Sequence, residues 1–177
     1  MKKFFLPAIA CCMLSIHCHA QDTVYLRKKN NNSIVYTDRP PQVLFIELYG
    51  RGLVYSANYD TRFKKQIGGA GFSAGLGVLT VSGFTVVTIP VSFNYLMGGT
   101  KGKFFETGAG ITYLNTKSSD IFNSDSPRKS STLMGNFTFG YRSQPLNEGF
   151  CFRAGLNLLA GGGYFGPYPY ISFGYSF

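Results

Sequence analysis

The chain has 177 residues with 17 basic and 8 acidic side chains, two histidines, four cysteines and no tryptophan. This length suits one domain and is too short for two of ordinary size. The positive charge contains no lysine-rich run with interleaved aromatic residues, so nucleic acid is not an expected partner. Loops lying against anionic lipid headgroups are the simpler interpretation of the charge.

The first twenty residues have the pattern of a secretory signal peptide. Two lysines precede the mostly apolar segment 4–16, and Cys18 and Ala20 are small residues at the positions that a signal peptidase reads. We therefore predict cleavage after Ala20. A lipoprotein signal ending at Cys11 is the weaker alternative, because it leaves an apolar region of only about seven residues.

Cleavage would change the chemistry that the chain can perform. Residues 21–177 retain 15 basic and 8 acidic side chains, one cysteine and no histidine. An internal disulfide and histidine-based catalysis or metal binding are then excluded. Cys151 lies between Phe150 and Phe152, where a small filler residue is a simpler interpretation than a reactive thiol. We expect no catalytic residue, no metal and no cofactor.

Residues 21–42 are polar and rich in basic residues, asparagine and proline. This composition is typical of an extension outside a folded core, and only Val24, Tyr25 and the segment 34–36 are apolar enough to dock against anything. We predict a periplasmic N-terminal extension over 21–42 that precedes a barrel domain over 43–177.

From residue 43 onward apolar and polar residues alternate with a period of two, which predicts eight strands. Most have ten or more residues, enough for a tilted strand to cross a bilayer core of about 30 Å. Pro90 falls inside the fourth strand, where we expect a bulge or an edge defect. One connection, at 116–130, is long and rich in Ser, Asp and Lys. The strands are predicted at about 43–50, 53–63, 70–80, 84–95, 103–115, 131–143, 150–160 and 167–177.

Each predicted strand has one apolar face and one polar face. In the last strand Ile171, Phe173, Tyr175 and Phe177 share the apolar face, and no charged residue falls on this face in any strand. A membrane barrel would turn the apolar faces outward, whereas a soluble barrel would turn them inward, so alternation alone does not choose between them. The opposite faces carry six charged residues, namely Glu47, Asp60, Arg62, Glu106, Arg142 and Arg153.

Two further patterns favour the membrane barrel. The aromatic residues of the apolar faces gather at the strand ends that share a side with the C-terminus, with Tyr55 and Tyr113 at the opposite rim, as in the interfacial girdles of membrane barrels. The polar faces contain many glycines, which leave room for long neighbours inside a tight barrel but would only weaken strands on a water-facing surface.

With these features the chain resembles the small eight-stranded outer-membrane barrels of Gram-negative bacteria, of OmpA/OmpX-type architecture, over residues 43–177. The resemblance depends most on the ending Tyr175-Ser176-Phe177, and also on the segments 47–50, 55–59 and 89–91. It implies an all-β, up-and-down transmembrane barrel in the outer membrane. It also implies that Phe173, Tyr175 and Phe177 form the signal by which the barrel assembly machinery recognises the chain.

An eight-stranded barrel is just wide enough for side chains to fill its interior. Among the predicted lumen residues three acidic side chains balance three arginines, and we expect Glu106 and Arg142 to meet because they lie near the same end of adjacent strands. A structural network of paired charges is the simpler interpretation, and a narrow ion or proton path is the functional alternative.

Three classes of function remain open. The leading hypothesis is a non-enzymatic surface protein that meets an unknown external partner through the 116–130 loop, with Asp120, Phe122, Asp125, Arg128 and Lys129 available. The second is an outer-membrane enzyme acting on lipid, although such enzymes of this architecture commonly depend on histidine. The third is a soluble lipocalin-like carrier, for which an early tryptophan and an apolar cup are expected, and the chain has no tryptophan.

Overall fold

The computed structural model describes residues 25–29, 32–81, 84–98, 101–118 and 128–177. Within these ranges the chain forms ten strands and one short 3-10 helix, η1 (Gly50–Gly52). None of the helical structure in these ranges is long and apolar enough to span a membrane.

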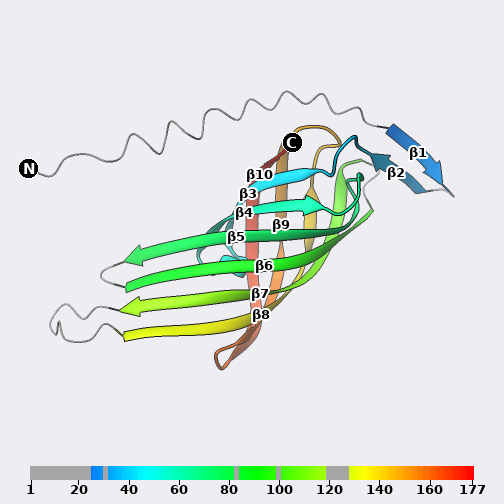
Figure 1. Cartoon of the computed structure of the whole chain (residues 1–177). Helices are drawn as coiled ribbons and strands as arrows, with labels where there is room; N and C mark the ends of the chain where they lie inside the picture. Colours follow the sequence, from blue (N-terminus) through cyan, green and yellow to red (C-terminus); the bar gives the residue numbers. More distant parts are fainter. Residues whose placement is uncertain (1–24, 30–31, 82–83, 99–100, 119–127) are drawn as a thin grey trace, which may run out of the picture.

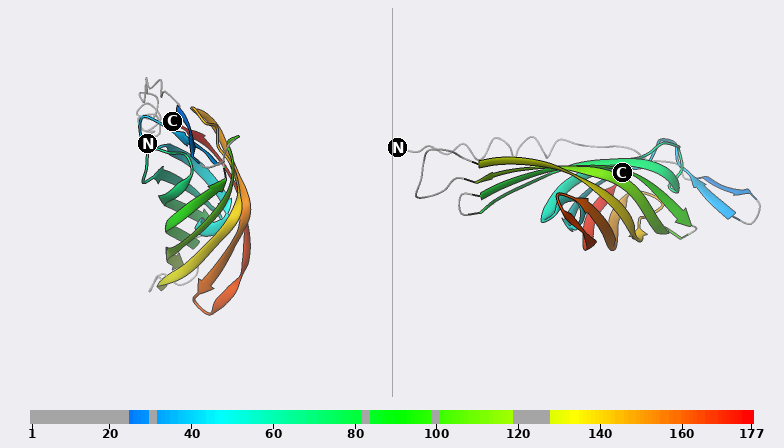
Figure 2. Two further views of the ribbon diagram at one scale, coloured as in Figure 1. Left: turned by 90° about the vertical axis from the view of Figure 1, so that its right-hand side faces the viewer. Right: turned by 90° about the horizontal axis from the view of Figure 1, so that it is seen from below.

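Eight antiparallel strands form a closed barrel in the order β10-β3-β4-β5-β6-β7-β8-β9 (Figures 1 and 2). The barrel closes between its first and last strands, where Ser172 pairs with Glu47 and Ser176 with Val43. The predicted fold class, an eight-stranded up-and-down barrel, is therefore confirmed. The strands are β3 (Gln42–Tyr49), β4 (Tyr55–Arg62), β5 (Gly69–Val81), β6 (Phe84–Gly98), β7 (Lys103–Ser118), β8 (Arg128–Ser143), β9 (Gly149–Gly161) and β10 (Tyr164–Ser176).

The predicted connection 116–130 was too long. β7 and β8 stay paired as far as Ser118 and Arg128, so the segment between the strands is 119–127 and lies outside the described residues. The prediction placed Thr116 to Ser118 and Arg128 to Ser130 in the loop because these residues are polar. A hairpin that extends beyond a barrel is held by backbone pairing and needs no apolar face.

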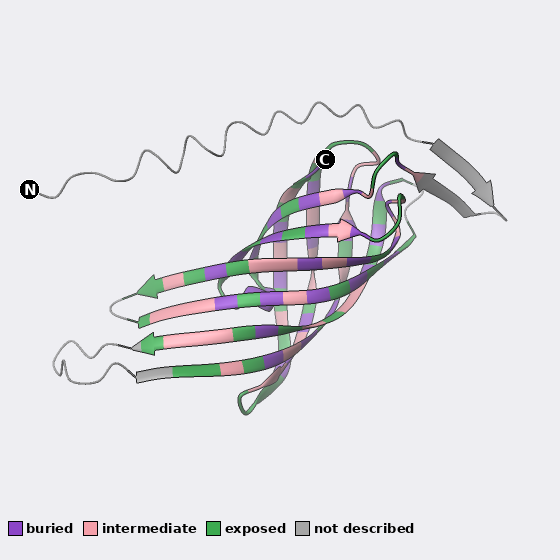
Figure 3. Cartoon of the chain, viewed as in Figure 1, coloured by how far each residue is buried: buried purple, intermediate pink, exposed green. Residues whose placement is uncertain are grey.

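The alternation of faces is borne out through the middle of the eight strands, and at the outer ends of β5 and β6 the apolar residues turn inward instead. The polar faces point into the lumen, where Glu47, Asp60 and Arg142 are completely buried, and the apolar faces point outward. Phe93 and Phe137, for example, keep 61% and 52% of their surface exposed. Figure 3 shows the resulting alternation of buried and exposed residues along the strands. The barrel has its hydrophobic side on the outside.

The N-terminal extension contains a hairpin that the sequence did not predict. β1 (Tyr25–Lys29) pairs with β2 (Asn32–Tyr36) as a separate two-stranded sheet. Tyr36 forms a bridge to Gln66, and the Thr37 amide donates to the Lys65 carbonyl at 3.1 Å. The hairpin is thereby tied to the connection between β4 and β5, at the end of the barrel that holds the C-terminus (Figure 1).

Pro90 interrupts a sheet ladder without producing a bulge. The pairing of β5 with β6 stops after Ala74 and Val91 and resumes at Gly77 and Thr88 in the same register, so no residue is inserted. The pairing of β6 with β7 runs through Pro90 and Thr112 without a break. The missing proline N–H accounts for this local gap toward β5, so of the two expectations the bulge was wrong and a defect in the ladder is present.

The wall of the barrel is uneven in height. β3 and β4 have 8 residues each, whereas β5 to β8 have 13 to 16. β4 pairs with β5 only as far as Ala57 and Leu76, and β10 pairs with β3 only from Tyr170 onward. The long strands therefore extend past their short neighbours at the end away from the C-terminus (Figure 1).

Candidate functional site

The lumen holds a network of buried charges built from alternate residues of the strands. In the first cluster, two arginines form ion pairs with the same carboxylate oxygen of Asp60 on β4. Arg62 Nη2 lies 2.6 Å and Arg142 Nη2 lies 3.0 Å from Asp60 Oδ1. The other oxygen accepts a hydrogen bond from Asn94 Nδ2 at 2.5 Å. Arg62 also donates to Asn94 Oδ1 and to the Gly69 carbonyl. Asp60 therefore joins β4, β6 and β8 across the interior.

A second cluster joins Glu106 on β7 to Arg153 on β9. Arg153 donates from Nε to Glu106 Oε2 at 2.8 Å and from Nη2 to Oε1 at 2.7 Å, a bidentate pair. The expected partner Arg142 comes only to 3.9 Å of Glu106 and makes its closer ion pair with Asp60. Glu106 and Arg142 thus approach each other, but the main partner of Glu106 lies two strands away.

Glycines explain how Glu106 reaches past β8. Gly140 on β8 stands directly opposite Glu106, and Gly155 on β9 stands directly opposite Gly140. A Cβ at Gly140 would lie 2.3 Å from Tyr170 Oη, and one at Gly155 would lie 2.5 Å from the Gly140 Cα. These two positions carry no side chain, and the Tyr170 ring of β10 occupies the space beside Gly140.

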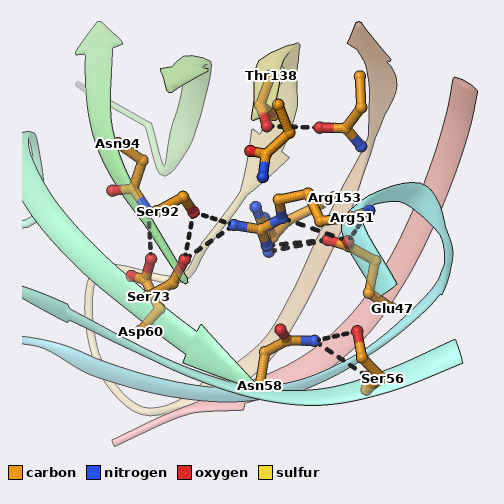
Figure 4. A network of polar contacts seen from close by, with 12 residues as sticks. Glu47, Arg51, Ser56, Asn58, Asp60, Ser73, Ser92, Asn94, Thr138 and Arg153 are labelled. Carbon is orange, nitrogen blue, oxygen red and sulfur yellow. Dashed lines mark hydrogen bonds and ion pairs between the residues drawn. The ribbon is translucent and has the colours of Figure 1, made fainter. Parts of the chain in front are cut away.

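The third cluster contains Arg51, which sequence reasoning missed. Its backbone N–H donates to Glu47 Oε1 at 2.9 Å, and Nη2 lies 3.0 Å from Glu47 Oε2. Nη1 donates to Ser73 Oγ at 2.8 Å and to Ser92 Oγ. Figure 4 shows the Arg51 side chain extending from Glu47 toward this serine pair. Arg51 keeps only 2% of its surface exposed although it lies between two strands.

The predicted balance of three acidic residues against three arginines is therefore corrected to three against four. The sequence was misleading because Gly50-Arg51-Gly52 has the composition of an exposed turn. A clue was available in the short first strand, which leaves the turn below the rim of the longer strands. Such a turn can fold into the lumen, where its arginine contacts the carboxylate of the residue four positions earlier in the sequence.

Three side chains hold the inward-folded turn by its backbone. Thr112 donates to the Arg51 carbonyl at 3.0 Å, Thr88 to the Gly52 carbonyl at 3.2 Å and Tyr168 to the Leu53 carbonyl at 2.9 Å.

The residues flanking the helix have positive φ angles: Tyr49 at 59° and Leu53 at 68°. Each such conformation costs on the order of 1–3 kcal/mol, which the surrounding contacts must offset. We call η1 with its flanking residues, 49–54, the plug: Gly50, Arg51 and Gly52 are buried in the lumen, and Tyr49 and Val54 are exposed at its rim.

Comparison with known proteins finds no matching family and no matching curated relative. A solved structure does resemble the chain: the N-terminal β-barrel domain of Pseudomonas aeruginosa OprF. The two superpose with a TM-score of 0.57 and 16% sequence identity, over 78% of this chain and 96% of that domain.

The chain has the barrel fold of OprF. At this level of identity the likeness concerns the fold alone.

The lumen of this OprF-type barrel is also closed at the end that holds the C-terminus. Ile67, Leu96 and Phe104 form a buried apolar cluster there, with Leu146 packed against it. The cavity beside this cluster, lined in part by Thr37 and Gln144, has a volume of about 20 Å³, which is room for about one water molecule. The plug, the charge network and the cluster together fill the lumen from the plug to the end that holds the C-terminus.

The remaining residues singled out in the sequence lie in different places. Cys151 is buried in a cluster with Val43 and Phe45. Phe173 and Tyr175 point outward with 43% and 52% of their surface exposed.

Phe177 follows β10 and pairs with Gln42 through both backbone groups, at 3.0 and 3.3 Å. Asp120, Phe122 and Asp125 lie outside the described residues. Arg128 and Lys129, expected in the loop, are the first two residues of β8, opposite Ser118 and Lys117.

Proposed function

We propose that the protein is an integral outer-membrane barrel with a closed lumen and no enzymatic activity, and that its role is structural or lies in interactions at the cell surface. The observation that carries the proposal is that charged residues are inside and apolar residues outside, the reverse of the arrangement in a soluble protein. Seven charged side chains are buried inside the barrel, while large apolar residues such as Ile46, Phe93 and Phe137 are exposed outside. Exposed apolar surface of this extent around a whole barrel is stable only in contact with hydrocarbon.

The charge network supports a closed interior over an ion path. Arg51, Arg62, Arg142 and Arg153 each contact at least one carboxylate, and their chains of contacts cross the lumen from wall to wall. Moving an ion through this region would require several such pairs to separate. Breaking one buried pair costs about 3–5 kcal/mol. The lumen is therefore proposed as a stabilising core that takes the place of the hydrophobic core of a soluble protein.

The proposed partners follow from the same placement. Outer-membrane lipid would surround the apolar faces, and the barrel assembly machinery would recognise Phe173, Tyr175 and Phe177. An external partner would meet residues 119–127, which join β7 and β8 after the last pair, Ser118 with Arg128. A signal peptide ending at Ala20 would deliver the chain to the periplasm.

Fractionation and electrophoresis test the placement. We expect the protein in the outer-membrane fraction, resistant to extraction by carbonate, with a faster-migrating band when the sample is not heated. We also expect planar bilayers containing the refolded barrel to show no steady conductance. Recovery in the soluble periplasmic extract would contradict the membrane placement, and reproducible open channels would contradict the closed lumen.

A further inference from the structure

The low part of the wall ends inside the thickness of a membrane. β3 and β4 have 8 residues each, so at about 3.3 Å per residue and a tilt of about 40° they reach a height of roughly 20 Å. The apolar band of such barrels is about 25 Å tall. β5, with 13 residues, reaches roughly 33 Å on the same basis. The rim above β3 and β4 therefore opens at the level of hydrocarbon.

The residues around this low rim are apolar, as that depth requires. Tyr49 and Val54, on either side of the plug helix, have 57% and 43% of their surface exposed, and Phe165 on the neighbouring β10 has 77%. A turn that met water would carry polar residues at such positions. The β10 segment beyond β3 also contains Pro167 and Pro169, which offer no N–H group to a passing strand.

The inner face of β5 and β6 changes character above the plug. Lower in the barrel its cross-strand pairs are polar, as at Ser73 and Ser92. Beyond Thr88, which contacts the plug, the inner pairs become Leu79 with Val86 and Val81 with Phe84. On the outer face between them stand Thr80 and Thr85, whose hydroxyls lie 3.1 Å apart. The apolar side of these two strands is thus reversed at their outer end.

This reversed face stays uncovered by the described residues. Val81 and Phe84 have 56% and 45% of their surface exposed, whereas the inward residues below the plug are almost completely buried. Leu114 on β7, opposite Thr88, continues the apolar surface toward the next strand. An inward apolar face of this kind requires an apolar occupant.

We propose that the inner face formed by Leu79, Val81, Phe84, Val86 and Leu114 binds one acyl chain of a membrane lipid, which enters sideways over the low wall of β3 and β4. This proposal rests on the membrane placement proposed above. The low rim leaves this part of the lumen open toward hydrocarbon on the side of β3 and β4, and the plug, which Thr88 and Thr112 contact, lies directly below the face.

The absence of tryptophan from the chain allows a direct test with single tryptophan variants. Phe84→Trp places the probe on the inner face, Thr85→Trp places it on the outer face of the same strand, and Phe93→Trp marks the outer wall at mid-height. Each variant is reconstituted in phosphatidylcholine vesicles with increasing fractions of phosphatidylglycerol brominated on its acyl chains. Folding is checked by the mobility shift of unheated samples, and Val86→Trp replaces Phe84→Trp should the latter fail to fold.

A bound chain gives saturable quenching. We expect the tryptophan at position 84 to be half-quenched at a several-fold lower fraction of brominated lipid than the tryptophan at 93, and adding Leu79→Asn to remove this difference. Quenching at 84 that rises in parallel with that at 85 and 93, or no quenching at 84, would overturn the acyl-chain site. Absence of quenching at 93 would instead contradict the membrane placement itself.

Discussion

Arg153 binds Glu106 across an intervening strand, with two hydrogen bonds of 2.8 and 2.7 Å between side chains on β9 and β7. The pairing is possible because the wall between them presents Gly140 and Gly155. Arg142 and Arg153 stand opposite each other on β8 and β9. Their like charges are tolerated because Asp60 contacts the first guanidinium and Glu106 the second.

Removing the carboxylate of Glu106 should destabilise the barrel strongly. Glu106→Ala leaves the Arg153 guanidinium buried without its bidentate partner, and we expect the free energy of unfolding to fall by about 3–5 kcal/mol. Urea titration of the refolded barrel in detergent measures this loss.

Two further variants isolate the pair. Arg153→Met combined with Glu106→Ala should recover part of the stability, because no uncompensated charge then remains. Glu148→Ala, at an exposed glutamate, is the control and should change the stability by less than about 0.5 kcal/mol. Equal effects of Glu106→Ala and Glu148→Ala would refute the pairing.

A methyl group at Gly140 should not be tolerated. The added Cβ would lie 2.3 Å from Tyr170 Oη and 2.6 Å from the Ala154 carbonyl oxygen, so Gly140→Ala should cost about 1–3 kcal/mol through overpacking. Gly135 on the same strand is the matched control, since its Cβ would meet its nearest neighbour at 3.7 Å. Thermal melting followed by circular dichroism compares the two, and a melting point of Gly140→Ala at or above that of Gly135→Ala contradicts the crowded row.

Arg51 should hold the plug inside the lumen. Arg51→Ala removes the side-chain bonds to Glu47, Ser73 and Ser92 and keeps only the backbone N–H bond to Glu47. We expect a loss of about 3–5 kcal/mol in unfolding free energy.

Hydrogen exchange distinguishes release of the plug from a general loss of stability. The amides of Leu53 and Val54, which donate to Gly50 and Gly52, should exchange much faster in Arg51→Ala, while those of β7 and β8 change little. Unchanged protection of these two amides would show that the arginine does not retain the turn.

Phe177 should matter for assembly in cells and little for the folded barrel. It pairs with Gln42 through backbone groups alone, so Phe177→Ala keeps these bonds and should alter unfolding in detergent by less than about 1 kcal/mol. If the side chain is read by the assembly machinery, the amount of folded barrel in the outer membrane should fall several-fold. Phe165→Ala, at the most exposed aromatic residue of the opposite end, is the control, and equal outer-membrane levels of the two variants would exclude a special role for Phe177.

The alternation of side chains determined most of the fold. A strand assigns successive residues to opposite faces whatever its partners are, so the eight strands, their inward charges and their outward aromatic residues could all be predicted from local pattern. Parity places Glu47, Asp60 and Arg153 on one common face, and the aromatic girdles and the glycines identify that face as the inward one. Strand ends were less certain, because polar residues such as those around Ser118 and Arg128 remain paired beyond the barrel.

Only the closed barrel decided which of these charges meet. Whether Glu106 contacts Arg142 or Arg153 depends on the space left by Gly140 and Gly155, a property of three neighbouring strands that no single segment contains. The burial of Arg51 likewise depends on the difference in height between β3 and β5, which places a turn below its surroundings. The face on which a side chain lies depends only on its position along the strand. Which residues it contacts and how deep it lies depend on the closed barrel, and so do the plug and the apolar face above it.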